Sequence, residues 1–188
     1  RRLRQLHGMM GDLGFGWDKG AAWRGGVVDA IDPGMQGRIA EWRKSGLNIM
    51  MSEKSEAKPV SFLEDCAVEL KDLAEYTDKL TAIFDRNGVK GTWYAHASVG
   101  CLHVRPVLNM KQAGGAETMR AIAEEAFELV RSFGGSHSGE HGDGIVRSEF
   151  NDRMFGPVLP DLFRQVKAMF DPQGMFNPGK ITDAPKMD

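Results

Sequence analysis

The chain has 188 residues, of which 41% are hydrophobic and 27% are charged, as in a globular domain with one core and an extension. Its 24 basic and 26 acidic residues give a formal net charge of −2, which leaves no basic surface for nucleic acid and excludes nucleic acid as a partner. Two cysteines, Cys66 and Cys101, are too few for a disulfide scaffold, and no apolar run approaches the roughly 18 residues of a membrane span. We therefore expect a cytoplasmic protein without a transmembrane segment.

The N-terminal part of the chain is rich in glycine. Residues 1–35 show no hydrophobic period, which predicts an irregular arm or linker leading from an upstream domain. The stretch MQGRIAEWRKSG, residues 35–46, has the pattern of a short helix that ends at Gly46. The chain starts without an initiator methionine, and its last residues, ITDAPKMD, predict no final helix or strand. We therefore expect a piece of a longer protein. Its ordered domain should cover residues 36–188.

The middle of the chain has clearer periodicity. Residues 60–70 have strand character, and residues 70–88 place apolar side chains on one helical face before an Asn-Gly stop. Two further strands, 91–98 and 101–108, are separated by turn residues 98–100, which predicts a β-hairpin. This part of the chain therefore indicates the order strand, helix, strand, strand.

The C-terminal part adds helices. Residues 116–135 predict a second amphipathic helix, residues 136–139 a short strand, and a last helix breaks at Asp171 and Pro172. The complete order is that of a ferredoxin-like βαββαβ unit. We therefore predict an α+β fold in which helices cover one face of an antiparallel sheet, with an irregular N-terminal arm and a C-terminal helix.

One segment, GGSHSGEHGDGIVRSEF at residues 134–150, gathers titratable groups among glycines. Upstream, His96 and His103 fall on the two strands of the predicted hairpin, and a tight turn can bring such positions close together. With Glu140 they form a set of two imidazoles and one carboxylate, which suits a divalent metal and leaves a coordination position open, as in catalytic sites. His141 is then free to act as a base.

Other interpretations of these residues stay open. A histidine on a strand is more often a core or surface residue than a ligand, and the glycine-rich segment could be a solvated turn that caps a helix. Cys101 could be a soft metal ligand or a small buried residue. The glycines have a use in either case, because Gly139, Gly142 and Gly144 allow unusual backbone dihedral angles and the close approach of a flat ligand.

Three motifs resemble a known family. SGEHGDG (138–144), YAHASVGCLHVRP (94–106) and FDPQGMFNPGKI (170–181) look like the C-terminal domain of FAD-linked oxidases of the vanillyl-alcohol-oxidase type. The branch they resemble is that of the D-2-hydroxyacid dehydrogenases, which includes glycolate oxidase subunits, D-lactate dehydrogenases and D-2-hydroxyglutarate dehydrogenases. The sequence is most similar to long bacterial members that fuse this flavoprotein to an iron–sulfur domain, and the similarity is most secure over residues 36–181.

The resemblance implies a role for each matching residue. His96 and His103 match the paired metal-binding histidines of the family, and Glu140 matches the carboxylate ligand, with zinc or manganese as the expected metal. His141 matches the residue proposed as catalytic base. Asn177, in NPGK, matches a position that faces the flavin or the substrate.

The resemblance also implies a division of labour between domains. FAD would be held mainly by an upstream domain absent from this chain, while residues 36–188 cap the flavin and build the substrate pocket, with Gly142 and Gly144 on the cofactor side. Arg43 and Lys58 look like the basic pair that binds a substrate carboxylate; the alternative is that they are solvated surface charges, as most such residues are. One departure is the segment ASVGCL between the two histidines, where many relatives have a turn rich in glycine and aspartate.

The expected function is oxidation of a D-2-hydroxy acid to the 2-oxo acid, with hydride transfer to FAD and electron flow to an iron–sulfur cluster elsewhere in the parent protein. The isolated chain should be inactive. Two alternatives are a metal-free domain used for packing or assembly, and a metal-dependent hydrolase. We expect a cytoplasmic location. The alternative is a peripheral position at the inner membrane, held there through electron-transfer partners.

Overall fold

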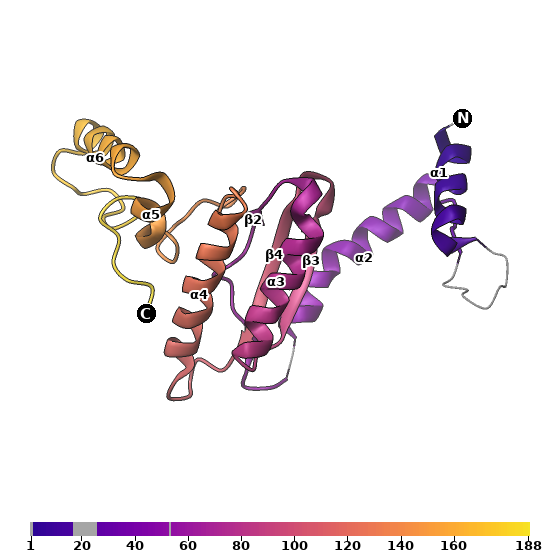
Figure 1. Cartoon of the computed structure of the whole chain (residues 1–188), viewed down its shortest axis with the longest axis horizontal. Helices are drawn as coiled ribbons and strands as arrows, with labels where there is room; N and C mark the ends of the chain where they lie inside the picture. The colour runs from indigo at the N-terminus through magenta and orange to yellow at the C-terminus, as the bar shows by residue number, and fades with distance from the viewer. Residues whose placement is uncertain (1, 17–25, 53) are drawn as a thin grey trace. The chain divides into compact units, whose positions relative to one another are not determined.

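The computed structural model describes residues 2–16, 26–52 and 54–188 (Figure 1). These residues belong to two compact units, Arg1–Ile49 and Met50–Asp188. The boundary between the two units lies after Ile49, inside a helix. Among the described residues, no helix is both long and apolar enough to cross a membrane.

The first unit is more helical than its glycine content suggests. Helix α1 covers Arg2–Met10 and continues into a short π-helical segment, η1, at Gly11–Phe15. The expectation of an irregular arm was therefore wrong for these residues, because Leu3 and Leu6 carry a helical spacing that the surrounding glycines obscure. Residues 26–32 have no helix or strand, as expected, and residues 17–25 lie outside the described part of the chain.

Helix α2, at Pro33–Met51, is longer than the predicted segment 35–46. Its start follows capping chemistry: Asp32 Oδ1 accepts the backbone N–H of Met35 at 2.7 Å, and proline occupies the first helical position. Gly46 does not end the helix, because a glycine inside a helix lowers stability by only about 1 kcal/mol.

The second unit is built on an antiparallel sheet whose central strand is β4, Cys101–Leu108. Strand β3, Gly91–His96, pairs along one edge of β4, and the short strands β1, Lys58–Pro59, and β2, Cys66–Ala67, share the other edge. Ser136, which belongs to no named strand, forms an antiparallel bridge with Ala67 of β2. This order of segments is that of the predicted βαββαβ unit, and the α+β fold class is confirmed.

Two predicted strands are reduced in the structure. Of residues 60–70, only Cys66–Ala67 pair as a strand. Asp65 then takes a positive φ of 63°. The predicted strand at 136–139 keeps only the bridge at Ser136.

Helices α3 and α4 run side by side and contact each other (Figure 1). Helix α3, Leu73–Arg86, follows the 3-10 turn η2, Leu70–Asp72, and ends where Asn87 Nδ2 donates to the carbonyl of Ile83 at 2.9 Å. Helix α4 covers Gly115–Ser132. Their buried side chains form one hydrophobic core with the sheet: Tyr76, Leu80, Ile83 and Phe84 from α3, and Met119, Ile122, Ala123, Ala126, Phe127 and Val130 from α4.

The alternation of strand side chains separates this core from the candidate site. On β4, Leu102 and Val104 belong to the core, while the intervening His103 points to the opposite face. On β3, Trp93 packs against Phe84 of α3 with ring centroids 5.6 Å apart. The helices thus cover one face of the sheet, and polar side chains gather on the other.

The C-terminal segment adds η4, Ser148–Phe150, α5, Asn151–Phe155, and α6, Val158–Phe170. The last helix ends at Asp171, as predicted. The Asp171 carboxylate accepts the backbone N–H groups of Met175 and Phe176, each at 2.9 Å, and so closes the loop that follows the helix.

Candidate metal and active site

The β3–β4 hairpin brings the two candidate histidines together. Tyr94 lies opposite His103 in the sheet and His96 lies opposite Cys101, so that the rings of His96 and His103 are 5.0 Å apart. The connection is the 3-10 turn η3, Ala97–Val99, closed by Gly100 with a φ of 70°. A hairpin of this tightness was predicted from the sequence.

Glu140 completes the predicted set from a distant loop. Its Oε1 lies 2.8 Å from His103 Nε2 and 3.6 Å from His96 Nε2. One donor atom from each of the three residues lies within 4.8 Å of the others. The side chain of His103 is 3% exposed, whereas those of His96 and Glu140 are 45% and 42% exposed, so the set is open on one side.

These three residues fit a divalent cation. Burial lowers the pKa of His103, partly offset by the carboxylate of Glu140, and a neutral imidazole is the form that binds a metal. Among the described residues, His103 Nδ1 has no hydrogen-bond partner. Two imidazole nitrogens and a carboxylate suit zinc or manganese and leave coordination positions for a substrate.

His141 stands beside this set. Its Nε2 lies 3.7 Å from Glu140 Oε1, and its ring stacks on that of His103 with centroids 5.1 Å apart. The side chain is 44% exposed. A half-exposed imidazole next to a cation site can accept a proton from a ligand bound there.

A second group of possible ligands consists of Glu64, His103 and His141. Glu64 is already paired: its Oε1 accepts hydrogen bonds from Arg105 at 2.6 Å and from the Tyr94 hydroxyl at 3.2 Å. Burial acts to raise the pKa of Glu64, but hydrogen bonds from Ser61 and Arg105 outweigh it and leave the pKa lowered. The arginine neutralises the carboxylate, so we interpret Glu64 as a structural residue that links Tyr94 of β3 with Arg105 of β4. No sequence motif pointed to it, because its partners lie 30 and 41 residues away.

The Cys101 thiol also borders the site. Its Sγ lies 3.8 Å from Glu140 Oε1, and burial followed by the negative charge of Glu140 raises the pKa of the thiol to about 11. The side chain is buried, as expected for a small packed cysteine.

The predicted cofactor residues surround one cavity of about 750 Å³ next to His141. Gly142, Gly144 and Asn177 all line it, with φ values of 81°, 57° and 45°. The remaining lining is largely apolar. It includes Asp143, between the two glycines, and residues of α6 and the loop after it: Phe163, Val166, Lys167, Phe170, Phe176, Lys180, Ile181 and Thr182.

Lys58, one of the predicted carboxylate-binding pair, does not line this cavity. Arg43 is exposed on α2, in the first unit. Lys58 is exposed on β1, where it pairs with Leu108, five residues along β4 from His103. At about 3.3 Å per residue, that register separates the two backbones by roughly 17 Å.

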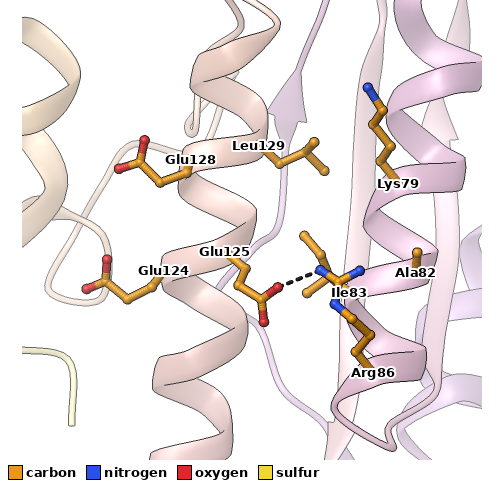
Figure 2. Close-up of a pocket in the computed structure, with 8 residues that line it drawn as sticks. All are labelled: Lys79, Ala82, Ile83, Arg86, Glu124, Glu125, Glu128 and Leu129. Carbon is orange, nitrogen blue, oxygen red and sulfur yellow. Dashed lines mark hydrogen bonds and ion pairs between the residues drawn. The ribbon is translucent and has the colours of Figure 1, made fainter.

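A second hollow, of about 570 Å³, lies between α3 and α4 on the helical side of the sheet (Figure 2). Figure 2 shows Arg86 of α3 reaching Glu125 of α4, an ion pair of 2.6 Å between largely exposed side chains. Such pairs contribute about 0–1 kcal/mol. No histidine or cysteine lines this hollow, and we assign it no chemistry.

The chain is similar to known proteins over most of its length. The sequence profile described as "FAD linked oxidases, C-terminal domain" matches residues 19–181. The D-2-hydroxyglutarate dehydrogenase of Pantoea ananatis is 37% identical over 163 residues, which cover 84% of this chain and 16% of that protein. The protein of the same name from Escherichia coli K12 is 37% identical over 155 residues, which cover 80% of this chain and 15% of that protein.

A more distant relative has a different name. The D-lactate dehydrogenase of Archaeoglobus fulgidus is 30% identical over 132 residues, which cover 70% of this chain and 29% of that protein. The chain thus spans between 15% and 29% of the length of these three relatives. The profile match and the identities agree with the three motifs around the candidate site, and the chain belongs to the family of C-terminal domains of FAD-linked oxidases.

Proposed function

We propose that this chain forms the substrate-binding part of an FAD-dependent dehydrogenase that oxidises a D-2-hydroxy acid to a 2-oxo acid. The observation that carries the proposal is the convergence of His96, His103, Glu140 and His141 on one face of the sheet, next to the cavity lined by Asn177. The names of the relatives, which include D-2-hydroxyglutarate and D-lactate dehydrogenases, support a 2-hydroxy acid as the substrate.

His96, His103 and Glu140 would hold the metal. When bound, a divalent metal supplies a Lewis acid for the substrate hydroxyl, and FAD supplies the acceptor for the hydride from C2. His141 accepts the hydroxyl proton, and we assign this role to Nε2, the nitrogen that faces Glu140. The substrate therefore loses one proton to the protein and one hydride, and becomes the 2-oxo acid.

The substrate carboxylate requires a cation, for which Arg43 and Lys58 are our candidates. Arginine would bind the carboxylate by a bidentate fork and lysine as a point charge. The assignment of Arg43 and Lys58 to this role rests on local sequence similarity to the family.

We also infer that most contacts to FAD come from residues outside this chain, with Gly142, Gly144 and Asn177 approaching the flavin from this side. Relatives of which the chain covers 15% or 16% are long enough to hold a flavin-binding domain and an iron–sulfur domain that accepts the electrons. We place the parent protein in the cytoplasm, with a peripheral position at the inner membrane if its electron acceptor lies there.

The test uses two variants of the full-length protein. His141→Ala should lower the rate constant of flavin reduction by about 10²–10⁴-fold in stopped-flow absorbance, with a much smaller change in substrate affinity. Elemental analysis of the wild type should find a single equivalent of zinc or manganese, and His103→Ala should lose it. An unchanged reduction rate would remove His141 from the mechanism. A wild type without metal, with normal activity in His103→Ala, would favour the metal-free packing domain instead.

A further inference from the structure

The loop that carries Glu140 and His141 is not held by regular secondary structure. Residues 139–144 belong to no helix or strand, and Gly142 and Gly144 adopt positive φ values. A glycine-rich loop loses much conformational freedom when it is ordered. Something outside the loop must therefore fix the carboxylate of Glu140 against the hairpin histidines.

Asp65 makes the contacts that order this loop. Its carbonyl oxygen accepts the backbone N–H of Gly139 at 2.8 Å. Its Oδ2 accepts the backbone N–H groups of Glu140 and His141, at 2.6 and 2.7 Å. Three successive N–H groups of the loop thus end on one residue, and a Cβ at position 139 would approach the Asp65 carbonyl oxygen to 2.7 Å, so glycine permits this approach.

Arg147 holds Asp65 in place from the other side. Its Nη1 donates to Asp65 Oδ1, to the carbonyl of Glu64 and, at 2.8 Å, to the carbonyl of His137, while Nη2 donates to the carbonyl of Gly142. One guanidinium therefore bonds the carbonyls of His137 and Gly142, on either side of Glu140 and His141 in the chain, and the carboxylate of Asp65. Both residues are buried, with Asp65 fully inaccessible and Arg147 8% exposed.

Asp65 connects the loop to the sheet as well. It directly follows Glu64, whose carboxylate is bonded to Arg105 of β4 and Tyr94 of β3. Asp65 itself has a φ of 63°, a conformation that a residue with a side chain keeps only where its surroundings demand it. Its Oδ1 lies 3.9 Å from His141 Nδ1, too far for a hydrogen bond, so Asp65 acts on the backbone of His141 and not on its imidazole.

We propose that Asp65 and Arg147 are positioning residues that hold Glu140 and His141 in register with the hairpin histidines. This inference rests on the proposed function, because it assumes that Glu140 binds a metal. Loss of a residue that orients a metal ligand typically weakens metal binding by about 10–100-fold. Asp65→Asn keeps the shape of the side chain but turns one acceptor into a donor, and Arg147→Lys keeps the charge but loses the fork.

Asp171→Asn is a matched control. The Asp171 carboxylate also accepts two successive backbone N–H groups and pairs with a cation, Lys167, but it does so in the loop after α6. The readouts are the dissociation constant for Mn²⁺ in the full-length protein, measured from the electron paramagnetic resonance signal of the free ion, and the melting temperature. We expect Asp65→Asn and Arg147→Lys to raise that constant at least 10-fold, and Asp171→Asn to change it less than 2-fold even where the melting temperature falls.

The outcomes separate this inference from the proposed function. If the wild type binds Mn²⁺, His103→Ala does not, and Asp65→Asn and Arg147→Lys bind as the wild type does, the positioning role is wrong and the proposed metal site stands. If Asp171→Asn weakens binding as much as the other two, the effect is general destabilisation and the inference is overturned. If the wild type binds no Mn²⁺ or zinc, both fail together. Should Asp65→Asn not fold, Arg147→Lys decides the question alone.

Discussion

Gly100 closes the turn that brings His96 and His103 together, and it is the position where a small perturbation should have a large effect. A Cβ at Gly100 would overlap with the carbonyl oxygen of Val68, and the residue has a φ of 70°. Its own carbonyl accepts the N–H of Val68 at 3.1 Å, which ties the hairpin turn to the segment after β2. Alanine at this position must therefore move the turn away from Val68.

The size of the effect follows from a comparison with Gly88. That glycine has nearly the same φ, 67°, but no atom lies within 4 Å of its would-be Cβ. Both substitutions carry about 1 kcal/mol for a side chain in the left-handed region. Gly100→Ala should lose in addition the hydrogen bond to Val68, about 1 kcal/mol, so the two variants should differ by at least about 1 kcal/mol in the free energy of unfolding.

Urea unfolding of the wild type and both variants, followed by circular dichroism, measures this difference. The same variants titrated with Mn²⁺ should show weaker binding for Gly100→Ala alone, because only its turn carries the histidine pair. Equal destabilisation by the two substitutions would show that the contact with Val68 relaxes without loss, and the link that we draw between turn geometry and the metal site would then be wrong.

Two further predictions concern stability. Leu80→Ala, at a fully buried position of α3, should lower the free energy of unfolding by about 3 kcal/mol. Leu70→Ala, at a position that is 59% exposed, should change it by less than about 0.5 kcal/mol. Similar losses for the two variants in urea denaturation would contradict the core described above. The second follows from Asp171, where Lys167 and then the backbone N–H of Phe176 lower the pKa to about 2. A carboxyl whose pKa is lower in the folded state stabilises above its unfolded value, near 3.8, and the stability gap to Asp171→Asn should close as the pH falls from about 4 to 2. Melting temperatures across that range check it, and a gap independent of pH would exclude the ion pair as its source.

Local sequence patterns were sufficient to predict the elements that are determined by residues close together in the chain. The alternation of apolar residues and the turn residues around Gly100 predicted β4 at its observed bounds, 101–108, and the Asn87–Gly88 pair predicted the end of α3. The same hairpin logic predicted that His96 and His103 would meet. In each case the signal and the structure lie within a few residues of one another.

Longer-range features could not be predicted in this way. Asp65 and Arg147 act across 75 to 82 residues of chain, and nothing near either residue in sequence indicates a partner. Residues 60–65 had the composition of a strand, but strand pairing depends on a partner distant in sequence, and only Cys66–Ala67 find one. Arg43 and Lys58 were chosen by local similarity, which says nothing of the distance between Lys58 and the histidines.

In the metal site that we propose, the alternation of side chains along β4 would make cation binding depend on strand register. If β4 slipped by one residue against β3, His103 would turn towards the helices and Val104 towards the open face, so a misregistered sheet would have no histidine pair. A cation that binds only the correctly paired hairpin stabilises that pairing by mass action, increasingly as the free ion exceeds its dissociation constant. At the site that we propose, a bound ion would therefore favour the native strand pairing, and metal supply during synthesis would influence how much of the protein reaches its native sheet.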